Sequence, residues 1–282
     1  MKIAVVYNLV EKPTGDIPLP DNWDIVIKRF ANSFVNYDSG CSHDLYICSS
    51  GGPLSDSSKE IFRNINYKKS ITYTGGGWDI GAYQFCAKQL ENYDFVICLN
   101  SQAYIAYADW LESFKNAFKR HGVGIYGASS SFEVAPHIRT SCIAFSPRLI
   151  NNYPLKVCCR YDACVFEHSP KNFSLWALKQ GLPVMVVMRS GIYSLLESRR
   201  KPNIFRHGSQ EELLINDRHT AIYNEATSIE RELLEKLANG ETKKEFHYLN
   251  PIRHFVARHA GLEKYQNYIV KLKVKFFQVF KL

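Results

Sequence analysis

The segment from Ile71 to Asn100 constrains the fold more than any other part of the chain. A short β-prone run leads into three consecutive glycines at positions 75–77, and a helical pattern of apolar residues follows. The next apolar run, Phe95–Leu99, has the composition of a strand that is buried on both faces. These parts form a βαβ unit, and ligands bind beyond the carboxyl ends of the strands in such sheets. Residues 75–79 and 100–102 are therefore predicted to face one crevice.

The glycines of this segment do not form a dinucleotide-binding fingerprint. Three of them are consecutive and the fourth is Gly81, whereas the fingerprint spaces them G-x-G-x-x-G after the first strand of a sheet. Here they follow what we predict to be the third strand. A tight turn that needs a positive φ is the alternative explanation for any one of them.

The other apolar patterns predict an α/β domain with a mostly parallel sheet and right-handed crossovers. We expect strands over residues 1–7, 43–49, 71–73, 95–99, 122–127, 141–146 and 182–188. We expect helices after a predicted N-cap at Asp21, over residues 58–65, 80–90, 107–121 and 228–238, and between His168 and Gln180. A chain of 282 residues is long enough for one domain over 1–225 and a helical C-terminal extension over 226–282.

Composition narrows the setting and the partners. The eight cysteines include no C-x-x-C pair, so we expect reduced thiols, as in the cytosol, and no zinc site. The apolar run at the N-terminus is too short for a signal peptide. No apolar run reaches the length of a membrane-spanning helix, which is about 18 residues. The net charge of +8 favours an anionic partner such as a nucleotide diphosphate or an acidic membrane. Because no RNA- or DNA-reading module is recognisable, we predict no nucleic-acid partner.

Three groups of residues resemble the rhamnan synthesis protein F-like glycosyltransferases, relatives of family 2 enzymes with a GT-A fold. They are Gly77-Trp78-Asp79-Ile80-Gly81-Ala82-Tyr83, Tyr93-Asp94-Phe95-Val96-Ile97-Cys98-Leu99-Asn100-Ser101 and Trp110-Leu111. The resemblance extends loosely from Met1 to about residue 225 and depends on the order and spacing of these groups. It implies a GT-A-like, Rossmann-type sheet. It also implies an inverting transfer of a hexose or deoxyhexose from a nucleotide-diphosphate sugar to a glycan hydroxyl, in surface polysaccharide biosynthesis.

The resemblance implies that donor contacts come from the ends of the first, third and fourth strands. The implied donor-binding residues are Tyr7, Asn8, Gly77, Trp78, Asp79, Asn100 and Gln102. For Asp79, capping the helix that follows is an equally good reason for its presence.

The resemblance also implies a carboxylate that takes the proton of the acceptor hydroxyl as general base. Glu167 is the candidate and Asp162 the second choice, while His168 and Arg139 are candidate acceptor-binding residues. Each has an alternative. The charge of Glu167 would support the N-terminus of the following helix. His168 would be a structural or exposed loop histidine, and Arg139 a solvated loop arginine.

The donor diphosphate is implied to lie against Arg206, Arg218 and His219, for which a solvated loop is the alternative. GT-A enzymes usually hold Mg²⁺ or Mn²⁺ with Asp-x-Asp, but here the position reads Asn100-Ser101-Gln102. Either the enzyme is metal-independent, or Asn100, Gln102 and His219 hold Mg²⁺ or Mn²⁺ weakly. A third alternative is a catalytically degenerate glycan-binding or scaffolding protein.

The tail over residues 265–282 is basic and apolar. Its larger apolar residues fit one helix face, although residues 270–276 alternate as a strand would. An anionic membrane surface is one predicted partner of this tail, and the domain itself or a second subunit is the other. We therefore expect a cytoplasmic protein, peripheral to the inner face of the membrane in the first case.

Overall fold

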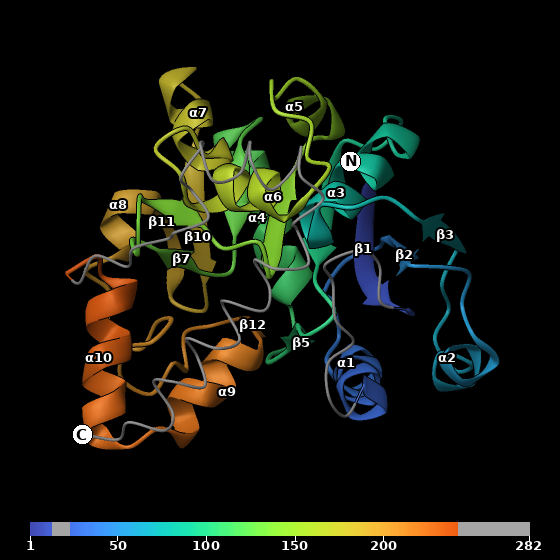
Figure 1. The fold of residues 1–282 in the computed structure, drawn as a ribbon, viewed down its shortest axis with the longest axis horizontal. Helices are drawn as coiled ribbons and strands as arrows, with labels where there is room; N and C mark the ends of the chain where they lie inside the picture. The colour runs from blue at the N-terminus through green and yellow to red at the C-terminus, as the bar shows by residue number, and fades with distance from the viewer. Residues whose placement is uncertain (13–22, 242–282) are drawn as a thin grey trace, which may run out of the picture.

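An eight-stranded sheet organises the structure, a computed structural model that describes residues 1–12 and 23–241 (Figure 1). Six strands run in one direction, and β9 and β11 run against them. Across the sheet, the order is β3 (Lys69–Tyr73), β2 (Asp44–Ser50), β1 (Ile3–Val10), β4 (Phe95–Leu99), β9 (Cys142–Phe145), β6 (Ile125–Gly127), β10 (Val184–Met188) and β11 (Gly191–Ser194). The predicted α/β class with a mostly parallel sheet is confirmed.

Two short two-stranded sheets accompany the large one. They pair β5 (Tyr104–Ile105) with β12 (Ile215–Asn216), and β7 (Ser130–Ser131) with β8 (His137–Ile138). Both pairs are antiparallel. The first pair connects the segment after β4 to the segment that precedes α9, so residues far apart in the sequence meet at one end of the large sheet.

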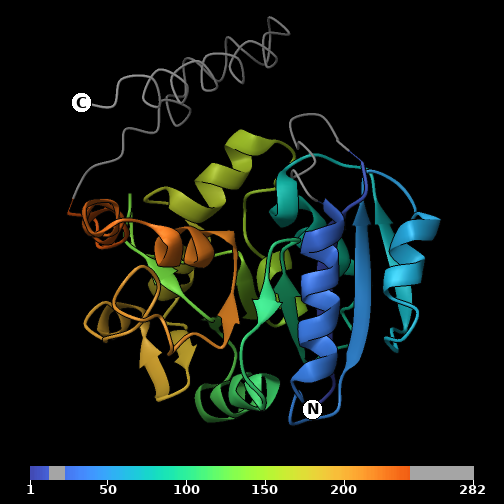
Figure 2. The ribbon, with the colours of Figure 1, turned by 90° about the horizontal axis from the view of Figure 1, so that it is seen from below.

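Helices cover both faces of the large sheet. Side chains from α3 (Trp78–Gln89), α5 (Pro147–Asn151), α6 (Arg160–His168) and α7 (Phe173–Lys179) pack on one face. Side chains from α1 (Trp23–Asn36), α2 (Asp56–Ile61) and α4 (Trp110–His121) pack on the other. The remaining helices are α8 (Leu195–Ser198), α9 (Arg218–Glu225) and α10 (Ser228–Ala238). Figure 2 shows α1 alongside the first strands, with α9 and α10 in orange at the opposite side of the molecule.

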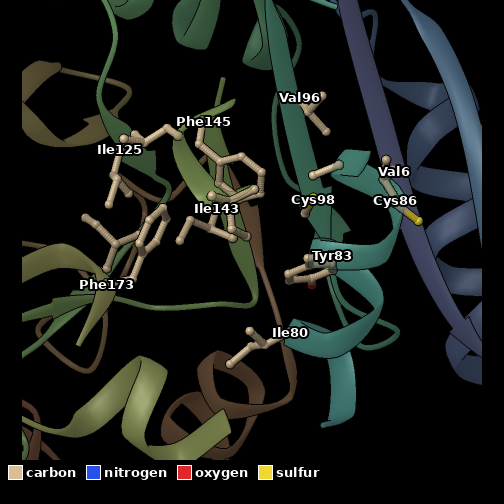
Figure 3. Packing of buried hydrophobic residues seen from close by; sticks show 14 of the residues in the cluster. Val6, Ile80, Tyr83, Cys86, Val96, Cys98, Ile125, Ile143, Phe145 and Phe173 are labelled. Carbon is tan, nitrogen blue, oxygen red and sulfur yellow. The ribbon is translucent and has the colours of Figure 1, made fainter. Parts of the chain in front are cut away.

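The central strands are apolar throughout because both of their faces are covered. Every residue of β1 and β4 is buried. In β1, Ala4 and Val6 join the cluster under α3, while Val5 and Tyr7 join the cluster under α1. Figure 3 shows the first cluster, in which side chains from β4, β9 and α3 fill the space between helix and sheet. Such continuous apolar runs are typical of strands that lie between two helical layers.

The strand order creates a crevice at the carboxyl ends of β1 and β4. The chain proceeds from β1 outward to β2 and β3, and then returns to β4 on the other side of β1. Tyr7 pairs with Leu99 in the parallel ladder, so Asn8, within β1, and Asn100, directly after β4, lie side by side. This is the position at which open α/β sheets bind ligands.

The glycines before and within α3 are required for two different reasons. Gly77 is the N-cap of α3 and has a φ of 89°, a conformation that favours glycine. A Cβ atom on Gly76 would lie 2.4 Å from the carbonyl oxygen of Cys158, and one on Gly81 would lie 2.3 Å from that of Gly76. The turn is therefore held tightly against the segment that leads into α6.

The structure corrects one prediction about the elements and leaves others untested. Glu167 and His168 form the end of helix α6 instead of a loop before the next helix. The predicted helix over 228–238 is confirmed as α10, but the Asp21 N-cap and the tail over 265–282 lie outside the described residues. All eight cysteines are free thiols. Within residues 1–12 and 23–241, none of the helices has the length and apolarity needed to span a membrane.

Candidate functional site

A cavity of about 150 Å³ lies between the start of α3 and one face of α6. Helix α6 lines it with residues at positions i, i+3, i+4, i+7 and i+8, which share one helical face. The complete lining consists of Trp78, Asp79, Ile80, Thr140, Arg160, Ala163, Cys164, Glu167 and His168. Four of the predicted site residues, Trp78, Asp79, Glu167 and His168, therefore meet at one cavity.

Asp79 connects this cavity to the crevice between β1 and β4. The Nδ2 of Asn8 donates to Asp79 Oδ1 at 2.5 Å, and Asn8 Oδ1 accepts from Ser50 Oγ at 2.8 Å. Burial, reinforced by the negative charge of Glu167, raises the pKa of Asp79 to about 6, although hydrogen bonds from Asn8 and Asn100 oppose this effect. Asp79 is thus a carboxyl group that titrates close to neutral pH.

Glu167 lies in a contrasting environment. Its Oε1 accepts from the backbone N–H and the hydroxyl of Thr140, both at 2.9 Å, and its Oε2 lies 3.3 Å from His168 Nε2. Burial alone would raise its pKa, but the interactions with His168, His137 and Thr140 outweigh burial and hold the pKa of Glu167 well below its ordinary value. The carboxylate therefore stays ionised.

The alternative role of Glu167 as a support for the following helix does not match these contacts. The N-terminus of α7 is capped by Asn172, whose side chain accepts from Leu175 N at 2.8 Å. Asp162, the second choice for the base, accepts from the backbone N–H groups of Cys158 and Cys159 at 3.0 and 3.2 Å. Asp162 therefore caps the start of α6 and does not line the cavity.

A neutral histidine lies behind His168. The rings of His137 and His168 meet edge to face, with centroids 4.8 Å apart. His137 Nδ1 donates to the Ala135 carbonyl at 2.8 Å, because a carbonyl oxygen only accepts. Burial, together with the nearby His168, lowers the pKa of His137 to about 4, so this ring is uncharged at neutral pH.

Arg139 forms a buried ion pair directly beside Thr140. Its Nη2 donates to Asp217 Oδ2 at 2.7 Å, and its guanidinium lies 3.6 Å from the centre of the Phe205 ring. The pair is almost fully enclosed, since the side chains of Arg139 and Asp217 are only 10% and 3% exposed. The alternative of a solvated loop arginine is therefore wrong. Arg139 holds Asp217, and its neighbour Thr140 holds Glu167.

Asp217 in turn positions His219 and, through it, Arg206. Asp217 Oδ1 accepts from His219 N at 2.8 Å and from Thr220 N at 3.1 Å, which caps α9. Arg206 Nη2 donates to His219 Nδ1 at 3.4 Å. Although His219 is exposed, the surrounding protein and the charge of Arg139 lower its pKa to about 4. The neutral ring accepts through Nδ1, so its proton is on Nε2, where it is a donor for an anion.

Arg206 and Trp78 share two unfavourable features that mark functional positions. Their φ angles of 52° and 55° lie in the left-handed region, which non-glycine residues rarely occupy. Arg206 Nε and Trp78 Nε1 are also buried without a hydrogen-bond partner. Among the described residues, these two alone combine both features. Strain and unsatisfied groups of this kind concentrate at binding and catalytic sites. Arg206 is buried, so it is not a solvated loop residue either.

The other predicted donor residues have different roles. Tyr7 is fully buried, its ring stacks on Phe30 with centroids 3.6 Å apart, and its hydroxyl donates to the Ser101 carbonyl at 2.8 Å. The prediction that Tyr7 contacts a donor is therefore wrong, because the core encloses it. Asn8 is 1% exposed and acts through Asp79. Gly77 forms the turn that places Trp78.

The strand end at the position of the metal-binding carboxylates is held by its own backbone. Asn100 Oδ1 accepts from Gln102 N at 3.1 Å, and Asn100 N donates to the Ser141 carbonyl at 3.1 Å. Over residues 1–12 and 23–241, no three His, Cys, Asp or Glu side chains are grouped closely enough to hold a metal ion. Whether Asn100, Gln102 and His219 hold one stays a prediction. Arg218 is exposed on α9 and does not line the cavity.

Several residues of the site were not predicted from the sequence. Arg160 and Cys164 precede the predicted His168 at intervals of four residues, and this helical spacing would have revealed the face of α6 that lines the cavity. Asp217 precedes a helix by one residue and is followed by Thr220 at the capping-box spacing, which marks it as an N-cap. The sequence holds no local signal for Thr140, whose role depends on a contact with a distant helix.

The comparisons with known proteins find only remote similarity. The sequence matches no protein-family model and no curated protein. Among solved structures, HddC from Yersinia pseudotuberculosis complexed with GMP-PN is 17% identical with a TM-score of 0.38, over 55% of this chain and 82% of that chain. Residues 1–349 of S. aureus TarS in complex with UDP are 14% identical with a TM-score of 0.39, over 55% and 49%. This chain thus spans about half of the length of that TarS fragment.

Replacing Asp217 with Asn tests the buried ion pair. Asn still caps a helix, so the change leaves Arg139 buried without its counter-charge, and we expect a loss of about 3–5 kcal/mol in the free energy of unfolding. Urea denaturation measures this loss. The control is Lys236→Met, which breaks an exposed pair with Glu232 and should leave the free energy of unfolding almost unchanged. Equal losses for the two variants would contradict the structural role of the pair.

The titration of Asp79 is a second test. Carbon-detected NMR should show its carboxyl titrating near pH 6, and Glu167→Gln should lower that pKa because it removes a neighbouring negative charge. Since the folded protein retains this proton to a higher pH than the unfolded chain, Asp79 makes the folded state less stable as pH rises from about 4 to about 6. A carboxyl that titrates at its ordinary value, or an unchanged pKa in the variant, would contradict the proposed coupling.

Proposed function

We propose that this chain is a glycosyltransferase that moves a hexose or deoxyhexose from a nucleotide-diphosphate sugar to a glycan hydroxyl. One observation carries this proposal. The adjacent residues Arg139 and Thr140 join a cavity that contains two carboxyl groups to a group of basic side chains. A sugar offers hydroxyl groups that donate to carboxylates, whereas a diphosphate requires cationic and N–H donors. The two halves of the site match the two halves of such a donor.

The basic half of the site suits a diphosphate. Arg139 pairs with the carboxylate of Asp217, and Arg206 donates to the ring of His219, whose backbone N–H the same carboxylate holds. Burial and the nearby Arg139 lower the pKa of Arg206, whereas Glu133 and Asp217 oppose this effect, and a bound anion would stabilise its charge further. The Nε2 proton of His219 supplies a further donor. Together with the predicted Arg218, these residues form the proposed diphosphate site.

The cavity half suits the transferred sugar and the reacting hydroxyl. Trp78 and Arg160 form one wall, with the guanidinium 4.8 Å from the indole ring, and Asp79 and Glu167 form another. One of these carboxylates is proposed to accept the proton of the attacking hydroxyl. Attack opposite the diphosphate inverts the anomeric carbon. His168, at the end of α6, is proposed to contact the acceptor.

The proposed setting is surface polysaccharide assembly at the inner face of the membrane. The resemblance of the sequence to rhamnan synthesis protein F-like enzymes supports it, as does the distribution of charge. Residues 242–282 contain nine Lys and Arg but only two Asp and Glu, so they carry +7 of the net charge of +8. Such a segment is attracted to anionic lipids. Packing on the domain or on a second subunit remains the alternative partner.

The donor and its metal requirement are tested by calorimetric titration. UDP, GDP, dTDP and CMP are each titrated with Mn²⁺ and with EDTA. One nucleotide should bind, and Arg206→Gln should weaken that binding about 10- to 100-fold, because charged hydrogen bonds contribute about 1.5–3 kcal/mol. The control, Arg120→Gln, removes an exposed charge from α4 and should bind normally.

Each result of this titration has a distinct meaning. Binding that survives EDTA supports a metal-independent transferase. Binding that EDTA abolishes shows that a metal is required, for which Asn100, Gln102 and His219 are the predicted ligands. Absence of binding by all four nucleotides contradicts the proposal and favours the alternative of a degenerate glycan-binding or scaffolding protein.

A further inference from the structure

We propose that Asp79, and not Glu167, accepts the proton of the attacking hydroxyl, while Glu167 acts as a charged positioning residue. This inference rests on the proposed function and names the catalytic group within the same cavity. It reverses the assignment that the sequence suggested. The reason is the set of hydrogen bonds that each carboxylate already makes in the folded protein.

The carboxylate of Glu167 is largely occupied. Its Oε1 accepts two hydrogen bonds from Thr140, and its Oε2 faces His168 at 3.3 Å. A carboxylate offers about four lone-pair positions, so little acceptor capacity remains for a substrate. Release of Glu167 from Thr140 would also leave a buried backbone N–H without a partner, which is unfavourable. Glu167 is therefore built to hold its position.

The carboxylate of Asp79 is fixed but remains open to a ligand. Ser50 Oγ donates to Asn8 Oδ1, so the orientation of the Asn8 amide is determined and its NH₂ group points at Asp79. Asp79 accepts from Asn8 and interacts with the amide of Asn100, which leaves lone pairs available in the cavity that it lines. Within residues 1–12 and 23–241, two neutral amides hold it, and neither neutralises its charge.

The charges around the two groups support the same division of roles. A general base works best when its pKa lies near the working pH, which fits the pKa of about 6 for Asp79 better than the very low pKa of Glu167. The ionised Glu167 contributes to this by repelling a second negative charge on Asp79. Pairs of carboxyl groups whose environments separate their pKa values divide catalytic roles in this way.

The proposed reaction is a displacement at the anomeric carbon of the donor sugar. The acceptor oxygen forms a bond to the anomeric carbon as its proton moves to the Asp79 carboxylate. The bond between the anomeric carbon and the diphosphate oxygen breaks, and its electron pair leaves with the diphosphate. Arg206 and the Nε2–H of His219 stabilise the charge that develops on this leaving group.

Two variants separate the roles of the carboxylates. Wild type, Asp79→Asn and Glu167→Gln are tested for release of nucleoside diphosphate from UDP-glucose, UDP-N-acetylglucosamine, GDP-mannose and dTDP-rhamnose, with water as acceptor at pH 8. Asp79→Asn should lower kcat about 10²- to 10⁴-fold with little change in KM, as expected for a general base. Glu167→Gln should retain activity within about tenfold, since Gln still accepts from Thr140. Asp56→Asn, at an exposed residue of α2, is the control.

The outcomes distinguish this inference from the proposed function. If Glu167→Gln abolishes release while Asp79→Asn retains it, Glu167 is the base and the inference is wrong. The Glu167→Gln result decides the question even if Asp79→Asn does not fold. If the wild type binds a donor but Asp79→Asn releases nucleotide at the same rate, only the inference fails. If the wild type neither binds nor cleaves any of the donors, the proposed function fails with it.

Discussion

The buried ion pair between Arg139 and Asp217 is the interaction on which the candidate site depends. It joins residues 78 positions apart and ties the segment before β9 to the start of α9. An isolated buried charge is energetically unfavourable, so each partner requires the other. Separation of the two segments would therefore destabilise the folded protein. Because Thr140 follows Arg139, the same pair also fixes the N–H and hydroxyl that hold Glu167. This one ion pair therefore positions side chains in both halves of the site.

The site places carboxyl groups and basic side chains on opposite sides of two adjacent residues, Arg139 and Thr140. On one side, Asp79 and Glu167 share a small cavity, and on the other side Arg139 pairs with Asp217 while Arg206 contacts His219. Each half carries a charge that burial makes unfavourable, and each would be relieved by the complementary part of a bound molecule. The strained backbone of Trp78 and of Arg206 indicates that the fold tolerates a cost at both places.

Much of the framework could be predicted from the sequence, because it follows from local patterns. Continuous apolar runs located the central strands, and the order of strands and helices placed Asp79 and Asn100 at one crevice, to which the family resemblance added Asn8. The error about Tyr7 came from ending the first strand at residue 7. Strand β1 continues to Val10 and is covered on both faces, so Tyr7 is buried within it.

The remainder of the site depends on contacts that no local pattern records. A solvated arginine and a buried one look identical in a sequence, and Arg139 differs only through a partner 78 positions away. The role of Glu167 likewise depends on Thr140, 27 positions earlier. Helix α6 was missed because its nine residues begin beside a cysteine pair and carry few strongly apolar side chains, so its period is weak.

A crystal structure with a bound nucleotide sugar tests the central claim most directly. The account predicts that the diphosphate lies within hydrogen-bonding distance of Arg206 and His219, about 2.7–3.2 Å, and that the sugar enters the cavity beside Asp79. The ion pair between Arg139 and Asp217 should remain intact between them. A nucleotide that binds elsewhere on the sheet, or a sugar that points away from the cavity between α3 and α6, would contradict the account.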